Sequence, residues 1–395
     1  MSALVDPRLL DEIKDYGVVE IDACFNCGNC TAACTLTSEN DNFPRKIIRY
    51  AQLGLKDKLV GSKELWLCYN CGECSETCPR QVEPAAFMMA ARNYAISNFD
   101  FIGLGRLLSS KPVLGTILLI VMNFVFFMFL YTNRGDMHTE ELKLFEFLPY
   151  EFIHTFGLAA MVFVGLAGLV VVVNMVVQVS KSANLKATNF LVLASKEWWQ
   201  ALWEAVGVQA LGQKSYRDNC ANLPDAPPWY LKKWFIHAAA FWGFLGLLLA
   251  TILDYVLDIV NIKETGAFMP IFHPIRLLGT LAGLLMVYGV SVLMARRIVK
   301  PDKAHSNSTF SDWAFLVLLW VSGVTGFAVE ISLYLPQAMW GYWLLLVHVA
   351  FSIELILLLP FSKFAHAILR TTALFIHAFS PIAESKLAET EAAAD

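Results

Sequence analysis

The pattern of hydrophobic and polar residues changes near residue 111. Before that point, apolar residues recur at helical spacing in short stretches such as 9–13 and 83–97, which is typical of amphipathic helices in soluble domains. After it, apolar segments of about twenty residues recur, and each is long enough to cross ~30 Å of hydrocarbon as an α-helix. The chain contains six of them, at roughly 112–131, 151–179, 234–260, 274–295, 312–335 and 341–362, and the last is expected to continue helically to about residue 369.

This pattern predicts an all-α fold with three parts. Residues 1–110 are expected to form a helical domain, 111–370 a six-helix transmembrane bundle, and 371–395 a cytoplasmic tail. The end of the tail, from residue 383, is acidic and alanine-rich and is expected to be disordered. The loop 181–233 is too long for a plain connection, and its aromatic segment 197–203 predicts an amphipathic helix at the membrane surface or at a partner.

Lysine and arginine gather on one side of the predicted bundle. The loops after the second and fourth spans carry Lys181, Lys186, Lys196, Lys214, Arg217, Lys232, Lys233, Arg296, Arg297, Lys300 and Lys303, whereas the other side carries Arg134, Lys143, Lys263 and Arg276. Basic loops stay in the cytoplasm, so both termini are expected there. The start of the chain lacks the pattern of a cleaved signal, and we expect a multi-pass protein of the inner (cytoplasmic) membrane.

Eight of the nine cysteines fall in two copies of the spacing C-x2-C-x2-C-x3-C, and Pro79 follows the last of them. This is the ligand pattern of two [4Fe-4S] clusters. The first three thiolates of a run reach one cluster, while the longer gap turns the fourth toward the neighbouring cluster. The spacing therefore assigns Cys24, Cys27, Cys30 and Cys78 to cluster 1, and Cys68, Cys71, Cys74 and Cys34 to cluster 2.

The sequence argues against two other roles for the cysteines. Paired C-x2-C units also bind structural zinc, but the duplicated run that ends in Cys-Pro favours clusters. Disulfides are not expected in a reducing cytoplasm.

A net charge of −4 with no basic face does not suggest that the chain binds nucleic acid. The chain has no dinucleotide fingerprint such as G-x-G-x-x-G, so any flavin has to come from a partner protein.

Histidines in the apolar segments point to haem. His348 and His366 are eighteen residues apart, which is five full helical turns, so on one continuous helix both rings would share a face ~27 Å apart. Together with the clusters, this spacing favours two stacked b haems, although a lone histidine in a span is often only a hydrogen-bonded polar group. His237 begins the third span on the cytoplasmic side and is expected to pair with His366. For the outer haem, His154 is preferred over His273 as the partner of His348.

These motifs resemble two known families. Residues 1–110 resemble the iron–sulfur protein HdrC of heterodisulfide reductase, and 111–370 resemble the cytochrome b (gamma chain) of respiratory nitrate reductase, mainly through the eighteen-residue histidine spacing. Their fusion resembles the QmoC family of membrane proteins of quinone-interacting membrane-bound oxidoreductases. One feature departs from the gamma-chain pattern. In gamma chains one early helix supplies two haem ligands ten residues apart, whereas in this chain the residue ten positions after His237 is Leu247.

The resemblance implies a membrane subunit that exchanges electrons between menaquinol and cytoplasmic flavin and iron–sulfur subunits, with adenylylsulfate reductase as the downstream acceptor. Two alternatives stay open. If electrons passed through the same cofactors in the opposite direction, the protein would be a quinone reductase, in a complex of the heterodisulfide reductase or sulfite reduction type. A membrane transporter would use the intramembrane ionisable groups to line a solute path, but it predicts inverted repeats that the sequence does not display.

Ionisable residues near the outer ends of the spans predict where quinol is oxidised. Oxidising a quinol releases protons, so the site needs a base and a polar route to water. Charged groups are costly within a bilayer and usually face the bundle interior or a wet cavity. His273, Arg276, Glu330 and Asp254 share the outer leaflet and are the predicted quinol site, although any one of them could instead anchor a helix or form an ion pair.

Overall fold

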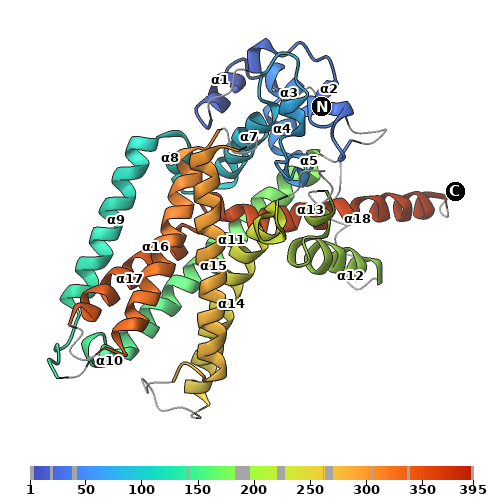
Figure 1. Ribbon diagram of the computed structural model, residues 1–395. Helices are drawn as coiled ribbons and strands as arrows, with labels where there is room; N and C mark the ends of the chain where they lie inside the picture. The colour runs from blue at the N-terminus through green and yellow to red at the C-terminus, as the bar shows by residue number, and fades with distance from the viewer. Residues whose placement is uncertain are drawn as a thin grey trace.

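The computed structural model describes residues 4–17, 21–37, 42–140, 142–182, 196–219, 227–260, 262, 270–301, 303, 307–335 and 339–392. Every regular element within these residues is a helix, so the predicted all-α class is confirmed. Figure 1 shows short helices gathered at one end of the molecule and long helices running away from them. Six helices, the predicted number, are long and apolar enough to cross a membrane.

The N-terminal domain is built from short helices around one longer one. They are α1 (Leu9–Lys14), α2 (Asn29–Ala32), α3 (Arg45–Gln52), α4 (Lys56–Val60), α5 (Glu64–Leu67), α6 (Glu73–Glu76), α7 (Pro84–Phe99) and α8 (Leu104–Ser110), with the 3-10 turn η1 (Ile21–Ala23). Pro84 begins α7 at the position where a missing N–H costs nothing. The apolar face of α7 and the fully buried Trp66 lie in the core of this domain.

The same core continues into two later helices. Met175 and Val179 of α11 (Tyr150–Ser182), and Leu369 and Ala373 of α18 (His366–Ala392), belong to the hydrophobic cluster that contains Trp66. Burial of apolar area stabilises such contacts by roughly 25 cal/mol per Å². The N-terminal domain is therefore packed against the rest of the chain and is not tethered to it by a free linker.

The remaining spans are α9 (Pro112–Thr132), α14 (Lys233–Ile259), α15 (Pro274–Val299), α16 (Phe310–Ser332) and α17 (Trp340–Leu358), with the short α10 (Leu144–Phe147) between α9 and α11. Their outward faces expose large apolar side chains, such as Leu166 at 61% and Leu281 at 53%. Helices α14 and α15 pack closely, because a Cβ at Gly243 or Gly289 would overlap backbone atoms of the other helix. An apolar exterior over close small-residue contacts suits a lipid environment.

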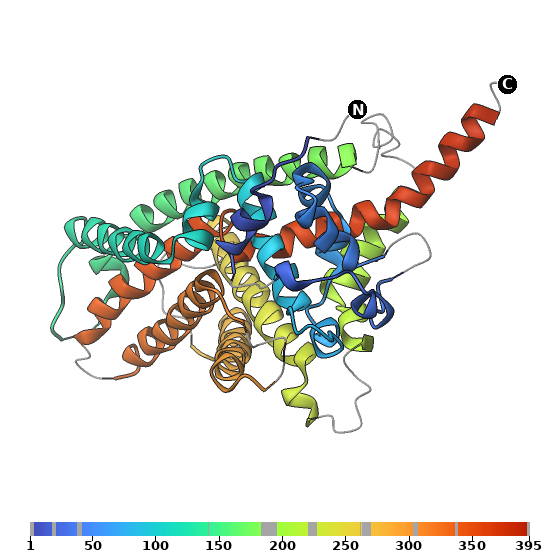
Figure 2. The ribbon, with the colours of Figure 1, turned by 90° about the horizontal axis from the view of Figure 1, so that it is seen from above.

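The last span ends earlier than the sequence pattern predicts. Helix α17 stops at Leu358, and a turn and the 3-10 helix η6 (Lys363–Ala365) precede α18. The expected continuation to residue 369 is therefore wrong, and His348 and His366 do not share one helix. Pro360 supplies the reason, since its ring clashes with the carbonyl one turn earlier and it has no N–H to donate. Figures 1 and 2 show α18 leaving the bundle in a different direction from α17.

The long connection between α11 and α14 covers α18. It contains α12 (Lys196–Leu202), the π-helix η3 (Trp203–Leu211), α13 (Lys214–Asn219) and η4 (Trp229–Leu231). The predicted aromatic helix is present, and its Trp198 packs edge-on against Phe375 of α18 with ring centroids 5.4 Å apart. The tail is also helical through Ala392, so the expectation of disorder from residue 383 is wrong up to that point; residues 393–395 lie outside the described residues.

Candidate electron-transfer site

The two cysteine runs adopt the same backbone turn. In the first run Asn26 and Gly28 have φ of 60° and 94°, and in the second Asn70 and Gly72 have φ of 56° and 97°. Asparagine and glycine are the residues that adopt this left-handed region most readily. Each turn leads directly into a short helix, α2 or α6. The repeat in sequence is therefore a repeat in structure, and it curls each set of thiols around one side of its turn.

Cys34 lies with the second run. One cavity is lined by Cys34, Cys68, Cys71 and Cys74, together with backbone and side chains of both runs. The pKa of the Cys34 thiol is raised to about 11, mainly by burial, and the nearby thiols of Cys68 and Cys71 contribute in the same direction. These four residues are the set that the spacing assigns to cluster 2.

Cys78 lies near the first run. Burial raises the pKa of the Cys30 thiol, and the surrounding thiols of Cys24, Cys27 and Cys78 also raise it. Within the part of the chain that the structure describes, no three His, Cys, Asp or Glu side chains are close enough to hold a single metal ion. For the second run, the thiols of Cys34, Cys68, Cys71 and Cys74 line a cavity. This geometry suits a cluster with several irons.

His237 and His366 come together beside the cluster domain. The pKa of His366 is lowered to about 3, mainly by burial, and the nearby His237 ring contributes in the same direction. The Nδ1 atom of His237 lies 3.2 Å from Oε1 of Gln213, and Nδ1 of His366 lies 2.5 Å from the carbonyl oxygen of Lys363. If each Nδ1–H donates to its oxygen, each Nε2 keeps its lone pair for a metal. The residues therefore fit a bis-histidine haem at this end.

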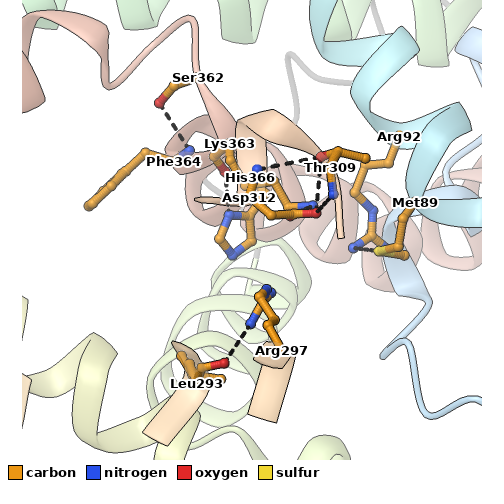
Figure 3. A network of polar contacts seen from close by, with 10 residues as sticks. All are labelled: Met89, Arg92, Leu293, Arg297, Thr309, Asp312, Ser362, Lys363, Phe364 and His366. Carbon is orange, nitrogen blue, oxygen red and sulfur yellow. Dashed lines mark hydrogen bonds and ion pairs between the residues drawn. The ribbon is translucent and has the colours of Figure 1, made fainter. Parts of the chain in front are cut away.

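A polar network fixes the turn that carries His366. Lys363 forms an ion pair with Asp312, with a Nζ to Oδ1 distance of 2.6 Å. Asp312 in turn closes a capping box with Thr309 at the start of α16. Figure 3 shows Lys363, Asp312, Thr309 and His366 gathered at this turn, with Arg92 of α7 beside them. The backbone that accepts from His366 is thus anchored to a different span.

Aromatic rings connect the second cysteine run to His237. Tyr69 directly follows Cys68, and its ring centroid lies 6.2 Å from that of Tyr216. Tyr216, on α13, lies 5.4 Å from the His237 ring. The connection between α11 and α14 therefore fills the space between the second run and the first residues of α14.

The histidines at the far end have different surroundings. Nδ1 of His348 lies 3.1 Å from Oγ1 of Thr325 on α16. His154 lies between two tyrosine rings, with centroids 3.8 Å from Tyr150 and 5.0 Å from Tyr255. Nδ1 of His273, the residue before α15, is buried and has no hydrogen-bond partner among the described residues.

The predicted quinol residues are partly brought together. Arg276 of α15 forms an ion pair with Glu330 of α16, with a Nε to Oε1 distance of 3.2 Å, and both side chains are about one-fifth exposed. Asp254 lies on α14 and is partly buried. On the same helix Asp258 accepts a hydrogen bond from the hydroxyl of Tyr150.

Sequence reasoning missed two polar residues in this half. One is Gln213, which contacts His237 from outside the spans, and no spacing rule connects it to that histidine. The other is Glu354 of α17, which is fully buried and accepts from Nδ2 of Asn123 at 2.9 Å. Its position as the single acidic residue in an apolar run was a signal available in the sequence.

Comparison with known protein families gives two matches. The family model described as "Citrate utilization protein B" matches residues 108–386, and the model described as "4Fe-4S dicluster domain" matches residues 20–82. The first covers more than half of the chain. The boundary between the two matches falls at the change in hydrophobic pattern, just before α9.

Individual relatives match the N-terminal part. The chain is 40% identical over 95 residues to the iron–sulfur protein HdrC of the CoB--CoM heterodisulfide reductase of Methanopyrus kandleri, which covers 24% of this chain and 47% of the relative. It is 37% identical over 91 residues to the corresponding protein of the H(2):CoB-CoM heterodisulfide,ferredoxin reductase of Methanothermobacter thermautotrophicus, covering 23% and 49%. The chain thus spans about half the length of the curated relatives it matches. No solved structure matches it.

Proposed function

The chain belongs to the family of citrate utilization protein B, and we propose that it is the membrane electron-transfer subunit of a quinone-interacting oxidoreductase complex. It joins a ferredoxin domain like HdrC of heterodisulfide reductase to a bundle of six apolar helices, as in a QmoC-like fusion. Residues 1–110 form the cluster domain in this proposal, and 111–370 form a dihaem cytochrome b domain.

One observation carries the proposal: the His237 ring lies near His366 and is joined to the second cysteine run by the rings of Tyr216 and Tyr69. Cys24, Cys27, Cys30 and Cys78 would hold one [4Fe-4S] cluster, and Cys68, Cys71, Cys74 and Cys34 the other; His237 with His366, and His348 with His154, would hold two b haems. When bound, these groups supply a series of one-electron carriers. The protein residues orient the carriers and exclude water between them.

At the opposite end, the chain would bind menaquinol. His273 would serve as the base for a quinol proton, because its buried Nδ1 has no other partner among the described residues. The ion pair of Arg276 with Glu330 holds polar groups within an apolar bundle and marks a route for that proton to the outer side. Asp254 would extend the same route.

Partners complete the reaction. The matched relatives are named as subunits of heterodisulfide reductases, so we infer cytoplasmic flavin and iron–sulfur subunits that take electrons from the cluster domain. Adenylylsulfate reductase is the proposed downstream acceptor. Both termini would lie in the cytoplasm, with the six spans in the inner membrane. The same carriers run in reverse would reduce quinone.

The test is a spectrum of the purified full-length protein with iron and haem counts. The proposal expects about eight non-haem irons and two b haems per chain. Electron paramagnetic resonance (EPR) of the reduced protein should show two interacting [4Fe-4S] clusters. A protein that binds clusters but shows no haem absorbance would contradict the proposal.

A further inference from the structure

Two arginines from distant parts of the chain meet at the second cysteine run. Nη2 of Arg92, on α7, donates to the carbonyl oxygens of Leu65 at 2.8 Å and of Cys68 at 2.9 Å. Nη1 of Arg370, on α18, donates to the same Cys68 carbonyl at 3.2 Å. Lys233 adds a third cation, since its Nζ lies 3.4 Å from the carbonyl oxygen of Cys71.

These arginine charges lack carboxylate partners. Arg92 is only 6% exposed, and among the described residues no Asp or Glu forms an ion pair with it or with Arg370. Each also lies near an aromatic ring, with Trp66 5.8 Å from Arg92 and Tyr69 4.9 Å from Arg370, and Nη1 of Arg92 lies 3.9 Å from Sδ of Met89. Burying two like charges side by side is costly unless an anion lies nearby. A cluster ligated by four thiolates is such an anion.

The equivalent carbonyl in the first run accepts from a neutral group; the guanidinium of Arg45 lies beside Gly28 of that run instead. Cys24 stands where Cys68 stands in the repeat, and its carbonyl oxygen accepts from Nε2 of Gln52 at 3.0 Å. The carbonyl oxygen of Cys24 thus accepts from an uncharged amide, whereas that of Cys68 accepts from two guanidinium groups. This difference between the repeats lies on the side of the second run that adjoins His237 and His366.

We propose that Arg92 and Arg370 are positioning residues that raise the reduction potential of cluster 2 above that of cluster 1. The inference rests on the proposed function. Reduction adds one electron, and therefore one negative charge, to the cluster, so fixed cations within a low-dielectric domain stabilise the reduced form more than the oxidised form. Cluster 2, which adjoins the His237 and His366 site, would then be reduced before cluster 1 and would hold the electron in preference to it.

The test is an EPR-monitored redox titration of the full-length protein. Arg370→Gln should lower the midpoint potential of cluster 2 and leave that of cluster 1 in place, whereas Arg370→Lys should retain most of the wild-type value. Arg370 is the residue to change, because its side chain is less buried than that of Arg92, which lies within the core. Loss of the cluster 2 signal in Cys71→Ser assigns the two signals, because Cys71 belongs to the second run whichever cluster takes the fourth ligand.

Gln52→Ala is the matched control at the equivalent position. It should shift cluster 1 by less than Arg370→Gln shifts cluster 2, because it removes a neutral donor. An unchanged cluster 2 potential in Arg370→Gln, or an equal shift of both clusters, would overturn the inference while leaving the proposed function intact. Absence of cluster signals from the wild-type protein would overturn both.

Discussion

The two ends of the helical bundle differ in how completely they are built around their histidines. At the end beside the cluster domain, His237 and His366 lie together, and each Nδ1 faces an oxygen from a different part of the chain. At the far end, His154 is enclosed by tyrosine rings and His348 faces Thr325. At the near end the two histidines lie near one another and both Nδ1 atoms face oxygens, whereas at the far end the rings of His154 and His348 have different neighbours.

The difference reflects what packs around each end. Near the clusters, α18, the connection that contains Gln213, and the N-terminal domain all cover the histidines. The far end has no comparable covering domain among the described residues, and its polar groups pair with one another, as Arg276 does with Glu330. Paired polar groups within the apolar bundle suit a site for a substrate from the membrane, whereas the covered near end suits fixed carriers.

Replacing a histidine should give the largest effect. His366→Ala or His237→Ala should remove one of two haems, so haem content falls by about half, because neither imidazole alone can form a bis-histidine site. His348→Ala should remove the other. Pyridine haemochrome analysis measures the loss. If His366→Ala kept both haems, the near-end pair would not be a haem site.

The exchange of fourth ligands predicts the next effect. Cys34→Ser should damage cluster 2 and spare cluster 1, although Cys34 belongs to the first run in sequence, because its thiol lines the cavity of the second. Cys78→Ser should damage cluster 1 and spare cluster 2. EPR of each variant shows which cluster is lost. Loss of cluster 1 in Cys34→Ser would show that each run holds its own cluster.

Changes at the far end should affect quinol chemistry without loss of cofactor. His273→Ala and Glu330→Gln should each slow quinol oxidation by roughly 10²-fold, the usual contribution of a general base. Haem and iron content should stay at wild-type levels. A His273→Ala variant that lost the outer haem would instead make His273, and not His154, the partner of His348.

The smallest effect should come from the group that orients His237. Gln213→Leu should weaken haem retention at the near end by about 10-fold, because outer-shell partners commonly contribute this much to metal affinity. Thr325→Val is the matched change at the far end and should affect the outer haem instead. Haem loss during titration with a competing apo-protein separates the two sites. If Gln213→Leu and Thr325→Val changed haem loss from the two sites in the same way, the two ends would not differ in how their histidines are held.

The sequence predicts the secondary-structure elements better than the tertiary contacts between them. Six spans, the helical cluster domain and the aromatic helix in the long connection all follow from apolar periodicity, which depends on neighbouring residues. The eighteen-residue spacing of His348 and His366 predicts one continuous helix, but α17 ends at Leu358, just before Pro360. Contacts such as Gln213 with His237, or Arg370 with Cys68, join residues far apart in the chain, and no local pattern encodes them.

The central claim is that electrons from quinol reach the clusters by way of the near-end histidines. The direct measurement adds a menaquinol analogue anaerobically to wild-type protein and to His366→Ala, and follows cluster reduction by freeze-quench EPR. Wild-type clusters should be reduced by the quinol, while His366→Ala clusters should be reduced by dithionite but not by the quinol. Equally fast reduction by quinol in both proteins would contradict the claim.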